Sequence, residues 1–202
     1  MSGIDESKSF VPVHIAVLTI SDSRDEASDK SGGLLAQFVK NAGHHLIAKT
    51  IVRDDKRAIV KQLKTFIRDP KVDVVIATGG TGVTGRDVTP EAFASVYEKE
   101  IPGFGELFRM QSYEKIKTST IQSRASAGVA GGTFLFALPG SPGACRDAWE
   151  GILRWQLDIR LRPCNFVELM PRLKEGEKPK RKAKKKSPQR KRKSRARSKK
   201  RR

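Results

Sequence analysis

The sequence predicts an α/β protein of three layers, in which a mainly parallel β-sheet lies between two layers of helices. Two features of the chain predict this class. Short apolar runs alternate with longer segments whose apolar residues recur at helical spacing. The runs are continuously apolar, which is typical of strands that are buried on both faces of a parallel sheet.

Four of these runs are the predicted strands. They are residues 13–20 (VHIAVLTI), 46–52 (LIAKTIV), 72–77 (VDVVIA) and 133–138 (TFLFAL). The first strand is expected to end at the turn residues Ser21-Asp22-Ser23. The third and fourth strands run directly into loops that contain glycine.

Five segments with helical periodicity are the predicted helices. They are residues 32–42, 54–67, a short segment from residue 89, 104–116 and 143–161. Gly43 is the expected end of the first helix, and acids in the first turn of the second suit the helix dipole. Thr89 is the expected N-cap of the third helix, with Pro90 at its first position. In the same way, Ser141 is the expected N-cap of the last helix and Pro142 precedes that helix.

Positive charge is concentrated at the C-terminus. The net charge is +19, yet residues 172–202 hold 19 basic and 2 acidic residues, whereas residues 1–171 hold 22 basic and 20 acidic residues. We therefore expect a flexible N-terminus over residues 1–10 and one domain over residues 11–171. Residues 172–202 are expected to be a disordered Lys/Arg-rich tail, because they lack apolar residues to bury.

The composition predicts a soluble, cytoplasmic protein. No apolar run approaches the roughly 20 residues of a membrane span, and the first residues lack the pattern of a secretory signal. The two cysteines, Cys145 and Cys164, lack the spacing of metal ligands. We expect two reduced thiols that are buried or partly buried.

The segment TGGTGVTGRDVTPEA, residues 78–92, predicts a phosphate-binding loop. It leaves the third strand at the carboxyl edge of the sheet, where open α/β folds bind ligands. Glycines let backbone N–H groups approach an oxyanion, and a helix N-terminus adds a positive dipole. The spacing matches neither the Walker A loop nor the dinucleotide fingerprint. The alternative is a tight turn without a ligand.

Two carboxylates are expected beside this loop. Asp87 lies within it, and Asp54 follows the second strand at the same edge of the sheet. A carboxylate repels phosphate unless a cation lies between them, and Mg²⁺ binds one or two carboxylates together with phosphate oxygens. The pair predicts a metal site for phosphoryl or nucleotidyl transfer. The alternatives are that Asp87 caps a turn and that Asp54 is an acid in the first turn of a helix, a role that Asp55 fits better.

Other polar residues are expected at the same edge. Ser21 and Asp22 follow the first strand, and the turn of residues 139–142 follows the fourth. Residues 29–32 and the pair Ser123-Arg124 are candidates for contact with an anion, since Arg suits phosphate. Each of these candidates has a purely structural role as its alternative.

The ordered set of motifs resembles the MoaB/MogA family of molybdenum-cofactor biosynthesis proteins, over residues 11–171. The motifs are LTISDSR (18–24), DKSG (29–32), IVRDD (51–55), TGGTGVTGRDVTPEA (78–92), PGFGELFRMQS (102–112), SRASAGV (123–129) and LPGSPGAC (138–145). The long glycine motif is highly specific. The segment from residue 102 to residue 128 and RPCNF (162–166) resemble the MoaB branch more than MogA.

The resemblance implies a MogA/MoaB-like, molybdopterin-binding fold that assembles as a trimer or a hexamer. Active relatives are molybdopterin adenylyltransferases, which join AMP from Mg-ATP to the terminal phosphate of molybdopterin and release pyrophosphate. Asp87 matches the position that holds Mg²⁺ and the reacting phosphates, and Asp54 aligns with the other functional acid. The remaining residues implied to contact phosphate or pterin are Ser21, Asp22, Thr78, Gly79, Gly80, Thr81, Gly82, Ser123, Pro139, Gly140 and Ser141.

Two other functions stay open from the sequence. Some members of the MoaB branch have lost the first acid, and a non-catalytic pterin-binding or scaffold protein is one alternative, although this chain keeps both acids. The other is a polyanion-binding protein. A Lys/Arg tail without aromatic residues attracts phosphates of nucleic acid nonspecifically and does not read bases. The segment 102–112 and the last helix are also expected to contribute to contacts between subunits, because Phe104, Leu107, Phe108 and Met110 are clustered in that segment.

Overall fold

The computed structural model describes residues 3–175, and its elements alternate as expected. The strands are β1 (Gly3–Ile4), β2 (His14–Ile20), β3 (His45–Val52), β4 (Val74–Thr78), β5 (Lys99–Glu100), β6 (Ser126–Ala130), β7 (Thr133–Leu138) and β8 (Leu161–Arg162). The helices are α1 (Lys30–Asn41), α2 (Lys56–Arg68), α3 (Thr89–Ala94), α4 (Pro102–Ile116), α5 (Pro142–Ala148), α6 (Arg154–Gln156) and α7 (Phe166–Leu169). Shorter 3-10 turns follow at Lys117–Gln122 and Met170–Arg172.

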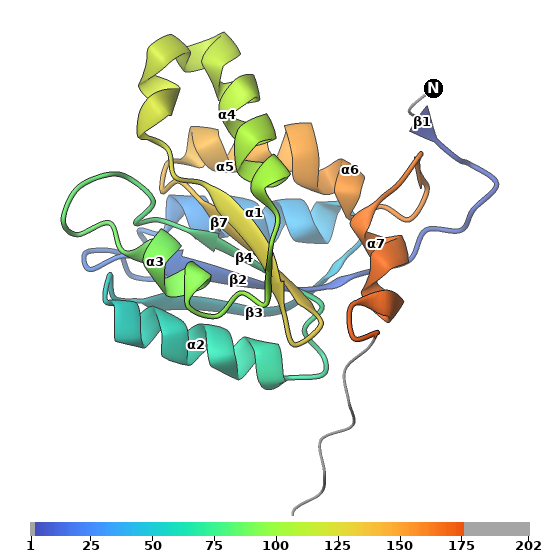
Figure 1. Cartoon of the computed structure of the whole chain (residues 1–202), viewed down its shortest axis with the longest axis horizontal. Helices are drawn as coiled ribbons and strands as arrows, with labels where there is room; N and C mark the ends of the chain where they lie inside the picture. The colour runs from blue at the N-terminus through green and yellow to red at the C-terminus, as the bar shows by residue number, and fades with distance from the viewer. Residues whose placement is uncertain (1–2, 176–202) are drawn as a thin grey trace, which may run out of the picture.

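A six-stranded sheet with the order β3-β2-β4-β7-β6-β5 forms the middle layer (Figure 1). The first four strands are parallel, and β6 and β5 run antiparallel to their neighbours. This confirms the predicted three-layer α/β fold. The chain passes from β2 outward to β3 and then crosses to β4, so β2 and β4 flank a topological switch point, where open sheets bind ligands at the strands' carboxyl ends.

Alternate residues of each central strand face opposite helix layers. In β2, Ile15 and Val17 join the cluster formed with α1, α4 and α5, whereas Ala16 and Leu18 join the cluster formed with α2 and α3. Both faces of β2 are therefore covered by helices. This two-sided burial is the reason that the strand is continuously apolar.

The prediction of one continuous last helix over residues 143–161 is wrong. Helix α5 is capped as expected, because the Ser141 side chain accepts a hydrogen bond from the N–H of Ala144. A π-helical segment, Trp149–Leu153, interrupts it and contains Gly151, a weak helix former. The helix ends at Gln156, and the Asp158 carboxylate then accepts the N–H of Arg160 in a turn.

Strands β5 and β6 have no strong signal in the sequence. The β6 segment, SAGVA, consists mainly of small residues. Gly128 lies in its middle, and a Cβ there would collide with the ring of Tyr97. Glycine at this position therefore lets the Tyr97 ring pack directly against the backbone of β6, a contact that exists only in the folded chain.

The remaining expectations have mixed outcomes. Cys145 is buried and free as expected, but Cys164 is exposed, because it lies on the surface connection between β8 and α7. Residues 3–4, expected within a flexible N-terminus, pair with β8 as strand β1. Within residues 3–175, no helix combines the length and hydrophobicity that a membrane crossing needs. The predicted tail lies outside the described residues from position 176 onward.

Candidate functional site

The glycine loop turns sharply as it leaves β4, and two glycines make this turn possible. Gly79 and Gly80 have φ angles of +112° and +61°, which favour glycine over residues with a side chain. A Cβ on Gly79 would also collide with the carbonyl oxygen of Ile20. The start of the loop is therefore packed directly against the end of β2.

Thr89 holds the loop in place instead of capping α3. Its hydroxyl donates a hydrogen bond of 2.8 Å to the carbonyl of Gly79, and its N–H donates one of 3.1 Å to the carbonyl of Gly80. The prediction of Thr89 as the N-cap is wrong, because the residue at that position is Val88, whose side chain makes no capping bond. The Thr hydroxyl is used by the loop and is not free to cap.

Two carboxylates flank the glycine loop. A Cβ placed on Gly80 would lie 2.9 Å from Oδ1 of Asp54, and one placed on Gly82 would lie 2.8 Å from Oδ2 of Asp87. Asp55, not Asp54, caps α2 by accepting the N–H of Ala58 at 2.8 Å. The Asp54 side chain is thus left free for another role beside the loop.

The electrostatic environments of the two carboxylates differ. Burial, together with the negative charge of Asp87, raises the pKa of the Asp54 carboxyl. Hydrogen bonds from the Thr84 hydroxyl and N–H, at 2.6 and 2.8 Å, lower the pKa of Asp87. Among the buried side-chain oxygens of residues 3–175, Oδ1 of Asp54 is the one without a hydrogen-bond partner.

This donor set fits a hard cation that is shared with phosphate. Mg²⁺ prefers carboxylate oxygens, and it typically takes one or two of them together with phosphate oxygens and water. Asp54 offers a buried oxygen without a partner, and Asp87 offers a carboxylate that stays ionised. Residues 3–175 contain no group of three or more His, Cys, Asp or Glu that could hold a metal by itself. The geometry therefore suits a cation completed by a phosphate ligand.

Arg124 clamps the glycine loop from the side of β6. Its Nε donates to the carbonyl of Gly82 and its Nη2 to the carbonyl of Asp87, both at 2.6 Å, and Nη1 pairs with Glu91. The sequence suggested Arg124 as a candidate for contact with an anion. Its guanidinium instead binds two carbonyls and one carboxylate of this chain.

Arg124→Lys is expected to loosen the loop and to lower the free energy of unfolding by about 2 kcal/mol, since one ammonium cannot reproduce the planar fork. Thermal unfolding measures the stability. Brief trypsin digestion with mass spectrometry measures cleavage after the exposed Arg86, which should become faster. The control is Arg109→Lys, because Arg109 makes a single longer bond of 3.4 Å to the carbonyl of Ala125. Equal effects of the two variants would contradict the clamp.

A cavity of about 740 Å³ opens beside the loop. The loops after β4 and β7 form one wall, and α4 with the 3-10 turn that follows it forms another. Its lining contains these predicted residues: Gly80, Thr81, Gly82, Asp87, Ser123, Pro139, Gly140 and Ser141. The structure thus brings most of the predicted residues to one cavity.

The other predicted residues, which are Asp54, Gly79, Thr78, Ser21 and Asp22, lie outside this lining. Thr78 is buried at the end of β4, where its hydroxyl donates to the carbonyl of Pro139 at 2.8 Å. Ser21 accepts the N–H groups of Ser23 and Arg24 in a turn. Asp22 accepts the N–H of Asp54 at 3.2 Å and pairs with Arg86, so it ties the loops after β2, β3 and β4 together.

Comparison with known proteins identifies the family. Residues 16–159 match the family described as "Probable molybdopterin binding domain". Molybdenum cofactor biosynthesis protein B of Escherichia coli strain K12 is 51% identical over 160 residues, which are 79% of this chain and 94% of that protein. The chain belongs to the MoaB family.

Solved structures of MoaB proteins have the same fold. A crystal structure of molybdenum cofactor biosynthesis protein B has a TM-score of 0.75 at 40% identity, and the match covers 82% of this chain and 98% of that one. The tungsten cofactor synthesizing protein MoaB from Pyrococcus furiosus has a TM-score of 0.59 at 37% identity, with 70% and 90% covered. The predicted resemblance to the MoaB/MogA family is thus confirmed.

The motifs of the MoaB family include the loops after β4 and β7, but they did not indicate the residues of the opposite wall of the cavity. That wall contains Ser112, Lys115, Ser119 and Gln122, none of which the sequence indicated. They come from α4 and from the 3-10 turn that follows it, whose Thr120 hydroxyl donates to the carbonyl of Arg109 in α4. Their spacing resembles that of any polar helix surface, so the sequence contains no signal that separates them from polar residues elsewhere on the surface.

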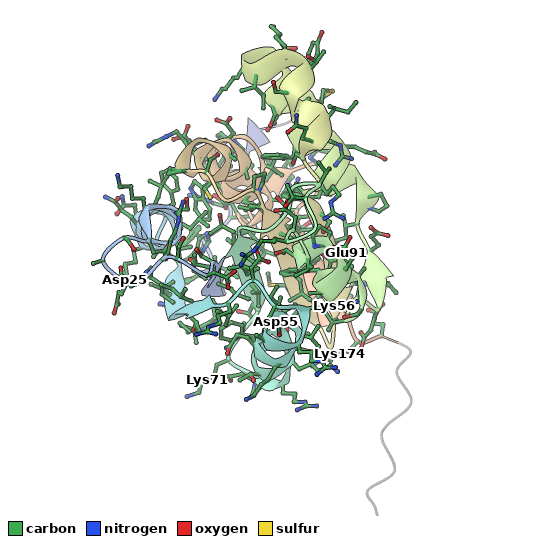
Figure 2. The ribbon with its side chains drawn as sticks, turned by 90° about the vertical axis from the view of Figure 1, so that its left-hand side faces the viewer. Asp25, Asp55, Lys56, Lys71, Glu91 and Lys174 are labelled. Carbon is green, nitrogen blue, oxygen red and sulfur yellow. The ribbon has the colours of Figure 1, made fainter. Side chains whose placement is uncertain are left out.

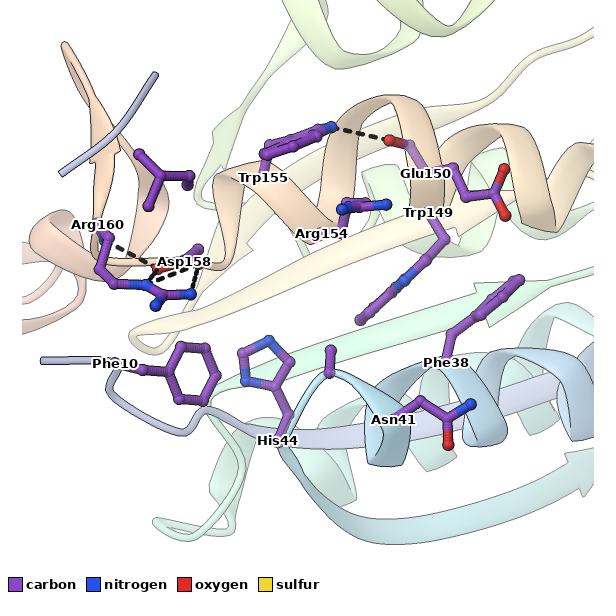
Figure 3. A pocket seen from close by; sticks show the side chains of 12 residues that line it. Phe10, Phe38, Asn41, His44, Trp149, Glu150, Arg154, Trp155, Asp158 and Arg160 are labelled. Carbon is purple, nitrogen blue, oxygen red and sulfur yellow. Dashed lines mark hydrogen bonds and ion pairs between the residues drawn. The ribbon is translucent and has the colours of Figure 1, made fainter. Parts of the chain in front are cut away.

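A second cavity of about 550 Å³ lies at the opposite edge of the sheet (Figure 3). Phe10, Phe38, His44 and Trp149 line it. The N–H of Val13 donates to Nδ1 of His44 at 3.1 Å, and burial lowers the pKa of His44 to about 4. Two arginines also line this cavity, but Arg160 is paired with Asp158 and Arg154 lies over the ring of Trp155. No glycine loop lies nearby, and the ring of His44 is neutral. The cavity beside the carboxylates is therefore the functional candidate in this MoaB-family chain.

The burial of neutral His44 predicts a loss of stability in acid. Its folded-state pKa of about 4 lies below the ordinary value of 6.5, so the unfolded chain binds the proton more tightly. The free energy of unfolding should therefore fall as the pH decreases from about 6.5 to about 4, by up to about 1.4 kcal/mol per pH unit from this group. Urea unfolding across this range should show a weaker dependence in His44→Gln. The exposed His45→Gln is the control, and a profile unchanged in His44→Gln would contradict the assignment.

Proposed function

We propose that this protein adenylylates molybdopterin, with ATP as the nucleotide donor and Mg²⁺ as the metal. The observation that carries the proposal is the pair of carboxylates on either side of the glycine loop, one with a buried oxygen that lacks a partner. Carboxylates beside a phosphate loop require a cation, and a cation shared with phosphates is the arrangement used for nucleotidyl transfer.

In the proposed reaction, an oxygen of the terminal phosphate of molybdopterin attacks the α-phosphorus of ATP. A new P–O bond forms, the bond between the α-phosphorus and the bridging oxygen breaks, and pyrophosphate leaves with that oxygen. The products are adenylyl-molybdopterin and pyrophosphate. Because both reactants are anionic, binding and charge neutralisation are the main tasks of the site.

This chain's own residues supply the positioning. The loop N–H groups are held in a fixed conformation by Thr89 and by the Arg124 clamp, so that they can contact phosphate without reorganisation. Asp54 and Asp87 would hold Mg²⁺, which when bound neutralises phosphate charge and makes the α-phosphorus more electrophilic. The cavity of about 740 Å³ is large enough for a pterin, and Ser123 and Ser141 offer hydroxyls within it.

The proposal is tested with purified full-length protein, molybdopterin, ATP and Mg²⁺. Chromatography should detect adenylyl-molybdopterin, and pyrophosphate should form in equal amount and only when the pterin is present. Binding of molybdopterin without either product would support the non-catalytic pterin-binding alternative. Failure to bind molybdopterin would contradict both functions.

We also propose that the protein forms a homo-oligomer through α4. Phe104 and Phe108, which the sequence placed in the contact, are buried in the core of the same chain. Exposed apolar side chains remain on α4 and the turn after it, and α4 extends beyond the rest of the domain (Figure 1). They are Leu107, Met110, Tyr113, Ile116 and Ile121. A dilute sample that sediments as a folded monomer would contradict this proposal.

A further inference from the structure

Helix α2 has a dense set of exposed cations. Its 13 residues include five basic residues and no acidic residue. The five are Lys56, Arg57, Lys61, Lys64 and Arg68, and all are exposed. None of them forms an ion pair with another residue of the described range 3–175. We call this set the α2 cationic face.

The α2 cationic face is the main concentration of positive charge on the domain. Without these five residues, residues 1–171 hold 17 basic and 20 acidic residues. The rest of the domain is thus slightly acidic, and the field that attracts anions is concentrated along one helix. A helix surface that only needs to be soluble can carry acidic and basic residues together, whereas α2 has basic residues alone.

The shape and composition of the face decide which polyanion it fits. An open depression of about 790 Å³ runs along α2 and continues to Ser95. Its lining has no aromatic side chain for stacking of unpaired bases. The apolar residues of α2, Ile59, Leu63 and Phe66, are buried against the sheet and cannot enter a lipid layer. The face therefore best fits a polyanion whose phosphates can be bound without stacking of bases and without insertion of the helix into lipid.

The described part of the chain ends beside the same helix. Lys174 contacts Gly132 in the turn between β6 and β7, and Ile67, near the end of α2, contacts the adjacent Gly131. Figure 2 shows Lys56, Lys71 and Lys174 in the lower part of the molecule, around α2. Residues 176–202 contain 17 Lys and Arg and one acid. Lys174 therefore adds one more cation to the region of the surface around α2.

We propose that the α2 cationic face binds the sugar-phosphate backbone of double-stranded nucleic acid. A 13-residue helix is about 20 Å long, and a duplex has one charge per roughly 1.7 Å of its axis, so several phosphates fall within reach of the five cations. The binding is independent of base sequence. The face lies in the α2 layer, and the candidate site opens toward α4 and α5, so the two functions are separable.

The test compares three full-length proteins that differ in two charges. They are the unchanged protein, Lys61→Gln/Lys64→Gln on the face, and Lys40→Gln/Lys99→Gln, which removes two exposed lysines elsewhere. Each is titrated with a fluorescent DNA duplex and an RNA duplex of equal length, from about 50 to 200 mM salt. Vesicles of phosphatidylserine are a separate arm. Circular dichroism checks that each variant is folded.

Counterion release predicts the result. The slope of log K against log salt should fall in magnitude by about 2 in Lys61→Gln/Lys64→Gln, and affinity at the lowest salt should fall at least about tenfold. The values for Lys40→Gln/Lys99→Gln should match the unchanged protein, as should adenylyl transfer in all three. Equal slopes in the three proteins would overturn the proposal, because the C-terminal segment alone would then account for binding. Loss of vesicle binding with unchanged duplex binding would overturn it as well.

Discussion

Asp87→Asn is expected to lower the rate of adenylyl transfer by more than about 10²-fold, because neutralisation of phosphate by a held metal supplies several kcal/mol of transition-state stabilisation. The substitution removes the charge that attracts the metal but keeps the shape of the side chain. The measurement is the rate of pyrophosphate release at saturating ATP and Mg²⁺.

The fold should survive Asp87→Asn. Oδ2 of Asp87 accepts hydrogen bonds from the N–H and the hydroxyl of Thr84, and the amide oxygen of Asn can accept the same two bonds. The control is Asp69→Asn, which removes one carboxylate at the end of α2, remote from the glycine loop. Turnover near the unchanged level in Asp87→Asn would remove this residue from the catalytic role, and the same loss in Asp69→Asn would show that the effect is nonspecific.

Asp54→Asn is expected to have opposite effects on activity and stability. Adenylyl transfer should fall by more than about 10²-fold, since the second carboxylate of the metal site is lost. The free energy of unfolding should rise, because Asn removes a charge that burial and the neighbouring Asp87 both disfavour. A residue kept only for structure would instead lose stability when changed.

The gain in stability expected for Asp54→Asn should depend on pH, and the direction of that dependence can be measured. The folded-state pKa of Asp54 is raised, so the ionised carboxylate destabilises the folded protein at neutral pH. This penalty shrinks as the pH falls from the folded-state pKa toward the lower ordinary value of 3.8, and the advantage of Asp54→Asn should shrink with it. Thermal unfolding at neutral and acidic pH measures the difference between the two proteins.

The neighbouring residue provides the control for Asp54. Asp55→Ala removes the N-cap of α2 and should cost about 1 kcal/mol of stability while leaving adenylyl transfer intact. The two adjacent acids should thus give opposite results in both assays. Loss of activity in Asp55→Ala equal to that in Asp54→Asn would mean that the start of α2, and not the Asp54 carboxylate, matters for the reaction.

The sequence alone predicts the parts of the fold that depend on local patterns. The strands buried on both faces are continuously apolar, so β2 and β7 were predicted to within one residue at each end. The predicted Ser141 cap is confirmed, because it depends on a short-range hydrogen bond to the N–H three residues on. The glycine motif also identifies the family, because its residues are adjacent in the chain.

Long-range contacts decide the remainder of the fold. Strand β6 has small residues where β7 and Tyr97 pack closely, and the last helix ends early where Asp158 forms a turn with Arg160. Neither feature has a periodic signal. Thr89 has the residue type of an N-cap, yet its hydroxyl binds Gly79, ten positions earlier.

What the sequence by itself determined is the family and the three-layer fold, and it marked Asp54 and Asp87 as the candidate carboxylates. Only the tertiary structure decided how those residues act. It left Oδ1 of Asp54 buried without a partner, turned Arg124 onto the carbonyls of the loop and closed the cavity with α4. The physical reason is that a hydrogen bond, or the desolvation of a charge, depends on which atoms are close in space. Asp54 and Asp87 are far apart in the sequence and are brought together by the crossing of the chain from β3 to β4.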